Sequence, residues 1–111
     1  MPTLELITWE GCPSTDEALA LISRAELDLG LKLSLTRREI NDYEEAQVAS
    51  FVGSPTFRVD GRDLFDTAGQ RSGLTCRIYH KPGGKFGPLP DFEEFKHNLS
   101  ASLNTAGEAN S

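Results

Sequence analysis

The feature that most constrains the fold is an apolar run that ends just before a Cys-Pro pair and a helical pattern. The run, Leu4 to Trp9, alternates loosely and suits a strand that is buried on at least one face. Cys12-Pro13 follows, and apolar residues then recur at helical spacing as far as Leu29, with Gly30 as a natural stop. We therefore expect the thiol of Cys12 at a corner between a strand and a helix.

The chemistry expected of Cys12 depends on where this helix begins. If Pro13 is its first residue, Cys12 is the N-cap, and the unpaired amides and partial positive charge of a helix start favour the thiolate. Ser14 and Glu17, however, match the spacing of a capping box. In that case the helix begins two residues later and Cys12 lies in a connecting turn. The sequence leaves both interpretations open.

The next segments predict a crossover unit followed by a hairpin. Residues 31–36 alternate leucine with polar side chains, which predicts a second strand and hence the strand-helix-strand unit of a parallel pair. A short helix is expected over about 42–52. Two further strands, 56–59 and 62–65, flank Asp60-Gly61, a dipeptide favoured in tight hairpins. These two strands are expected to be antiparallel neighbours.

The last third of the chain contains an insertion and a final helix. Residues 66–90 show no clear period apart from a short strand, 75–80, and a turn rich in glycine and proline. Asp91 caps a helix whose apolar residues lie on one face. The order of elements is βαβαββα, which predicts an α/β protein with one domain, residues 1–103, and a flexible tail, residues 104–111.

Composition limits the classes of partner. A chain of 111 residues with 38% hydrophobic and 25% charged residues is typical of one soluble domain, and no apolar run is long enough to cross a bilayer. The start of the chain does not resemble a signal peptide, so we expect a cytoplasmic protein. A net charge of −6 argues against binding to nucleic acid or to an anionic membrane. The two cysteines are expected as thiols, and neither has a metal-ligand spacing to His80 or His97.

Two motifs in this order resemble the thioredoxin-fold family, with glutaredoxins and small thioredoxin-like proteins closest in size and pattern. That family has a Cys-x-x-Cys motif, or a single-cysteine variant, after its first strand; here it is Cys12-Pro13-Ser14-Thr15, preceded by Trp9. A cis-proline before the third strand faces the active cysteine in the family, and Ser54-Pro55-Thr56 matches that position. The resemblance covers residues 3–103. It implies a mixed four-stranded sheet flanked by helices, with the insertion between the last hairpin and the last helix.

The chain departs from the family at the second cysteine of the motif. Thr15 stands there, so the dithiol cycle of an adjacent pair is excluded and a monothiol, or a domain without the chemistry, remains. Cys76 in the insertion is close enough along the chain to serve as a distal resolving cysteine. Alternatively, Cys76 and Ile78 point into the core under the last helix and alternate with Arg77 and Tyr79.

The resemblance implies a thiol–disulfide oxidoreductase or thiol-transfer protein in which Cys12 is the nucleophile. Cys76 or glutathione, as a co-substrate, would resolve the mixed disulfide. The expected partners are thiols and disulfides of proteins or small molecules, and no bound cofactor or metal is expected. The residues expected to contact the substrate are Trp9, Pro13, Ser14, Thr15, Ser54, Pro55 and Thr56. Two alternatives remain: a protein that captures a soft metal ion or organometal through Cys12, and a redox-inert interaction domain.

Overall fold

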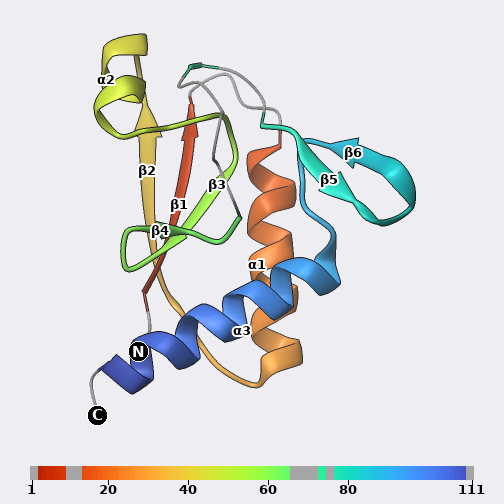
Figure 1. The fold of residues 1–111 in the computed structure, drawn as a ribbon. Coiled ribbons are helices and arrows are strands. Elements are labelled where there is room, and N and C mark those ends of the chain that lie inside the picture. The colour runs from red at the N-terminus through yellow and green to blue at the C-terminus, as the bar shows by residue number, and fades with distance from the viewer. Residues whose placement is uncertain (1–2, 10–13, 66–72, 75–76, 110–111) are drawn as a thin grey trace.

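The computed structural model describes residues 3–9, 14–65, 73–74 and 77–109 of the chain. Figure 1 shows a mixed α/β fold in which α1 and α3 pack against one face of a sheet. The α/β class expected from the sequence is therefore confirmed. The described elements are β1 (Thr3–Trp9), α1 (Thr15–Leu29), β2 (Ser34–Ile40), α2 (Tyr43–Val48), β3 (Thr56–Val59), β4 (Arg62–Asp63), β5 (Tyr79–Lys81), the 3₁₀ turn η1 (Pro82–Gly84), β6 (Lys85–Gly87) and α3 (Phe92–Ala109).

The main sheet is four-stranded and mixed, in the order β2-β1-β3-β4. β1 runs parallel to β2, as the strand-helix-strand order predicts, and antiparallel to β3. The pair Leu4↔Val59 begins the β1–β3 register and the pair Ile7↔Thr56 ends it. The segment before Thr56 therefore lies at the end of the sheet where β1 finishes.

Both faces of β1 carry buried side chains, but they belong to two separate clusters. On the face covered by α1 and α3, Leu4 and Leu6 pack with Phe57 and Phe95, whose rings meet edge to face with centroids 4.8 Å apart. On the other face, Ile7 packs in a smaller cluster with Trp9 at its margin; the buried members are Ile7, Ile40, Ala46 and Phe51. This smaller cluster lies beside the part of the sheet where β1 ends.

Several elements differ from the expected ranges, and β4 covers only Arg62–Asp63 of the expected 62–65. β2 begins at Ser34 rather than at residue 31, because Gly30 ends α1 in the left-handed conformation, with φ 65°, and a connecting segment follows. The Glu26 carboxylate accepts a hydrogen bond from the amide of Leu33 at 2.8 Å. Leu31 and Leu33, which suggested an earlier strand start, therefore lie in this connecting segment. α2 ends at Val48 rather than near residue 52, and Ser50 follows with a φ of 53°.

The insertion contains a small hairpin that the sequence did not predict. Its strands β5 and β6 form a separate two-stranded sheet, and η1 makes the turn between them. The expected strand over 75–80 is thus shorter and starts at Tyr79. The backbone of α3 continues to Ala109, past the expected helix end at residue 103, and the domain boundary there stays a prediction.

In the part of the chain that the structure describes, no helix combines the length and the apolar character needed to cross a membrane.

Candidate functional site around the cis-proline loop

The site begins with a buried loop that enters β3. The peptide bond between Ser54 and Pro55 is cis, which confirms the prediction made from the Ser-Pro-Thr motif. Ser54 and Thr56 are fully buried, and the Thr56 hydroxyl donates to the carbonyl of Gly53 at 2.6 Å. A buried hydroxyl that bonds a local carbonyl fixes the backbone next to the proline.

The cis-proline lies at the end of the sheet where β1 stops. Since Ile7 pairs with Thr56, the next residues outward are Thr8 on β1 and Pro55 on the loop. Trp9 is the last residue of β1, and the chain then enters residues 10–13. The loop and the end of β1 that leads to the Cys-Pro pair are therefore neighbours.

The two residues at the centre of the motif, Cys12 and Pro13, lie outside the described residues. The structure does describe where α1 begins: Ser14 is the N-cap, with φ −101° and ψ 7°, and Thr15 is the first helical residue. The hypothesis that Cys12 itself caps the helix is wrong on these bounds. The Ser14 carbonyl accepts the Ala18 amide at 2.9 Å, but the Ser14 side chain makes no capping bond. The helix therefore begins where the capping-box interpretation placed it, but the serine bond of that box is not formed.

Two buried polar atoms lie at this end of the sheet without a hydrogen-bond partner among the described residues. They are Nε1 of Trp9 and the hydroxyl oxygen of Ser54. A buried polar group that lacks a partner costs about 1–3 kcal/mol, so such groups need an explanation. Both groups can donate a hydrogen bond.

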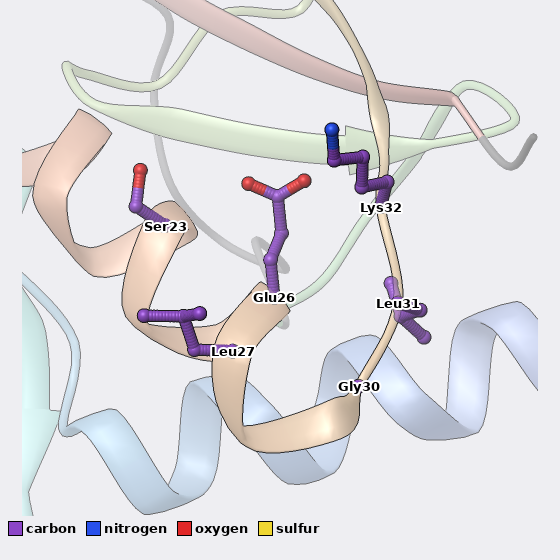
Figure 2. A pocket seen from close by; sticks show the side chains of 6 residues that line it. All are labelled: Ser23, Glu26, Leu27, Gly30, Leu31 and Lys32. Carbon is purple, nitrogen blue, oxygen red and sulfur yellow. The ribbon is translucent and has the colours of Figure 1, made fainter.

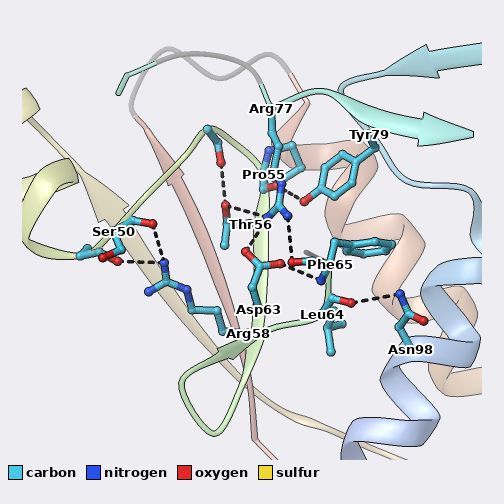
Figure 3. Close-up of polar contacts among 12 residues, drawn as sticks. Ser50, Pro55, Thr56, Arg58, Asp63, Leu64, Phe65, Arg77, Tyr79 and Asn98 are labelled. Carbon is cyan, nitrogen blue, oxygen red and sulfur yellow. Dashed lines mark hydrogen bonds and ion pairs between the residues drawn. The ribbon is translucent and has the colours of Figure 1, made fainter. Parts of the chain in front are cut away.

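The insertion contacts the loop through Arg77, a residue that the sequence analysis did not propose as part of the site. The Arg77 side chain is 1% exposed, and its guanidinium lies 2.6 Å from the carboxylate of Asp63 on β4. It also donates to the Thr56 hydroxyl and to the Phe65 carbonyl, each at 3.4 Å (Figure 3). A buried guanidinium needs this number of acceptors, because an unpaired charge would be costly to bury.

The backbone of the insertion also contacts the loop. The Arg77 amide donates to the Ser54 carbonyl at 3.0 Å, and the Gly73 amide donates to the Phe51 carbonyl at 3.0 Å. Gly53 has a φ of 140° and lies so close that a Cβ built on it would be 2.8 Å from Arg77 backbone atoms. Only glycine suits this combination of backbone angle and space.

Tyr79 completes the contact from the first strand of the hairpin. Its hydroxyl donates to the Pro55 carbonyl at 2.5 Å, and the Arg77 guanidinium lies 4.6 Å from the centre of its ring. Burial raises the pKa of the Tyr79 phenol well above its ordinary value, against the opposing effect of the Arg77 charge. The phenol therefore remains a neutral hydrogen-bond donor at physiological pH.

The alternation proposed as the second interpretation of Cys76 has the opposite phase. That interpretation placed Ile78 in the core with Arg77 and Tyr79 outside, but Ile78 is 58% exposed and the other two side chains are buried. Asp63 and the Pro55 carbonyl explain the reversal, because they satisfy the polar groups of the two buried side chains. Cys76 lies outside the described residues.

The described part of the chain contains no group of three or more His, Cys, Asp or Glu side chains that could hold a metal ion. His97 is exposed. Two hollows lie away from the loop. The larger, of about 520 Å³, lies at the end of α1 (Figure 2), where Glu26 and Lys32 border it and Glu26 already accepts a backbone amide. The smaller, of about 230 Å³, lies near Arg58 and Asp60.

A comparison of the chain with protein families, with curated proteins and with solved structures finds no match.

Proposed function

We propose that the chain has a thioredoxin-like arrangement and acts as a thiol–disulfide oxidoreductase or thiol-transfer protein, with Cys12 as the nucleophile. The observation that carries the proposal is the position of the cis-proline loop. Pro55 lies in register with the end of β1. That strand ends at Trp9, which is three residues before Cys12 in the chain. The order β2-β1-β3-β4, with its parallel and antiparallel pairs, supports the same arrangement.

The reaction follows from thiol chemistry. The Cys12 thiolate attacks one sulfur of a disulfide, a new S–S bond forms, and the other sulfur leaves as a thiolate that takes up a proton. A second thiolate then completes the exchange. If Cys76 attacks the sulfur of Cys12, a Cys12–Cys76 disulfide forms and the bound half of the substrate leaves as a thiol. If glutathione attacks instead, it takes over the bound half and returns Cys12 to the thiol.

The buried polar atoms give the loop a way to hold a substrate. Trp9 Nε1 and the Ser54 hydroxyl lack partners among the described residues, and both lie where β1 ends. Both atoms are buried, so an acceptor atom of a disulfide substrate next to Cys12 would satisfy them only after a local shift of the loop or of the Trp9 side chain. The loop carbonyls offer less, because the Ser54 carbonyl already accepts from Arg77 and the Pro55 carbonyl from Tyr79.

Intact mass after incubation with oxidised glutathione tests the proposal. The Cys76→Ser variant should gain the mass of one glutathionyl group, and Cys12→Ser should react far more slowly. In the parent chain, loss of two hydrogen atoms would indicate that Cys76 resolves, and a stable glutathionyl adduct would indicate that it does not. Equal reactivity of Cys12→Ser and the parent would contradict the proposal. Tight stoichiometric binding of a soft metal without thiol exchange would favour the capture protein instead.

A further inference from the structure

The insertion carries a charge opposite to that of the rest of the protein. Within it, residues 67–90, which follow Asp66, contain four of the 11 basic residues and none of the 17 acidic ones. The segment has a formal charge of +4, which leaves the rest of the chain at −10. A separation of charge this sharp within one small domain favours an anionic partner at the insertion.

The two lysines of the hairpin face each other. Lys81 and Lys85 are paired directly across the β5–β6 register, and no carboxylate among the described residues forms an ion pair with either. Like charges directly opposite each other on neighbouring strands destabilise a hairpin. Arg77, by contrast, is already neutralised by Asp63. Among the described residues of the insertion, the lysine pair is therefore the part that an external anion would stabilise most.

The two faces of the hairpin differ in chemistry. Side chains alternate along a strand, so Tyr79, Lys81 and Lys85 share one face, and Phe86, which pairs with His80, is on the other. Tyr79 is buried against the body of the protein, whereas Phe86 is 69% exposed. The exposed Ile78 immediately precedes β5. The hairpin thus offers cations on one face and an apolar ring on the other.

The hairpin also has an open strand edge. β6 belongs to a two-stranded sheet, and within the described residues it pairs with β5 alone. Figure 1 shows the hairpin projecting from the body beyond α1. An exposed edge of this kind can receive an extended peptide as a further strand, in which alternate side chains meet the two faces.

We propose that the edge of β6 binds an extended polypeptide segment in which acidic and apolar side chains alternate. In such a strand the acidic side chains lie on the face of Lys81 and Lys85, and the apolar ones lie beside Phe86. This surface adjoins the candidate site, because Tyr79 joins the hairpin to Pro55. The proposal is independent of the proposed function, since it requires no thiol.

The charge distribution favours a polypeptide over other anions. Nucleic acid or an anionic membrane would be repelled by the remaining charge of −10, whereas a peptide strand can reach the two lysines alone. A second copy of the chain is a poor donor of such a strand. Its alternating segments are Leu4-Glu5-Leu6 and Glu26-Leu27-Asp28-Leu29. The first lies on β1, which is paired on both sides within the sheet, and the second lies in the helix α1.

The test is a nuclear magnetic resonance titration of ¹⁵N-labelled Cys12→Ser/Cys76→Ser protein, which separates this binding from thiol exchange. The probe is the capped peptide Thr-Glu-Val-Glu-Val-Glu-Thr. We expect saturable amide shifts confined to residues 77–88. Lys85→Glu and Phe86→Ser should each weaken binding by about fivefold, as expected for a lost cross-strand pair. Leu35→Ser on the edge strand β2 is the matched control and should leave binding unchanged.

Several results would overturn the proposal. Equal binding of the peptide Thr-Glu-Glu-Glu-Val-Val-Thr, which has the same composition without alternation, would mean that charge alone acts. Shifts centred on β2 would place the peptide at the wrong edge. Saturable binding of a thymidine oligonucleotide at the hairpin would indicate a polyanion site. Self-association through the hairpin, measured as slower translational diffusion at higher protein concentration, would indicate that the partner is a second copy of the chain. Absence of binding at millimolar peptide would also reject it.

Discussion

The amide of Arg77 donates to the carbonyl of Ser54 at 3.0 Å, so the residue that follows Cys76 in the chain is bonded to the residue that precedes the cis-proline. The same Arg77 reaches Asp63 on β4 through its side chain. Three segments far apart in sequence are thus held together by one residue. Loss of this connection should therefore loosen the loop, β4 and the insertion together.

Replacement of Asp63 with alanine is expected to destabilise the protein by about 3–5 kcal/mol. The reason is that Arg77 would remain buried with its charge uncompensated, which costs far more than the pair itself contributes. Urea denaturation followed by circular dichroism measures the change. Asp28→Ala, which removes an exposed ion pair with Lys96, is the matched control and should leave stability nearly unchanged, because water and salt screen exposed charges. Similar losses in the two variants would show that the burial of Arg77 is not what matters.

Gly53→Ala tests the close approach of the insertion to the loop. A Cβ at this position would meet Arg77 backbone atoms at 2.8 Å, and the φ of 140° disfavours any other residue. We expect a loss of at least about 1 kcal/mol, together with weaker hydrogen-exchange protection of the Arg77 amide. Gly73→Ala is the control, because nothing lies near its Cβ position and its φ is not positive. Full protection of the Arg77 amide in Gly53→Ala would contradict this account.

The sequence predicted the parts of the fold that depend on local signals. The crossover pair was clear because the apolar run of β1, the helical spacing of α1 and Gly30 all act within short windows. The cis bond at Pro55 was predicted from a motif and its position before β3. These features need no knowledge of distant residues.

The parts that the sequence missed depend on partners far along the chain. Alternation from Cys76 to Tyr79 allows two phases, and the choice depends on Asp63, which lies 14 residues before Arg77. The start of β2 was misplaced because Glu26 holds the amide of Leu33 in a connecting segment. Periodicity carries no information about such acceptors. The lack of acidic residues in 67–90 was the available signal that the insertion is a distinct surface.

Tyr79→Phe should reduce stability by about 1 kcal/mol at neutral pH, since it removes the bond to the Pro55 carbonyl. The pH dependence gives a sharper test. Burial raises the pKa of Tyr79 in the folded state, so the folded state retains this proton when the unfolded chain loses it. Stability from this residue is complete below about pH 10, the ordinary pKa of tyrosine, and falls by about 1.4 kcal/mol per pH unit above it.

The measurement is the free energy of unfolding of both proteins from pH 8 to 11.5. The parent should lose stability more steeply than Tyr79→Phe above pH 10, so the difference between them shrinks and then changes sign. Tyr43→Phe is the matched control, because Tyr43 is exposed. Parallel curves for the parent and Tyr79→Phe would show that the phenol is not buried as described.

Ser54→Ala should separate stability from function. The Ser54 hydroxyl is fully buried and has no partner among the described residues, so its removal is expected to stabilise the fold by about 1 kcal/mol. If the hydroxyl instead serves a bound disulfide, the same change should slow the reaction of Cys12 with oxidised glutathione by about tenfold, the effect of losing one hydrogen bond in the complex. Ser34→Ala on the exposed edge of β2 controls for the substitution itself. A variant that is more stable and equally reactive would remove Ser54 from the site, and one that is less stable would show that the hydroxyl has a structural partner.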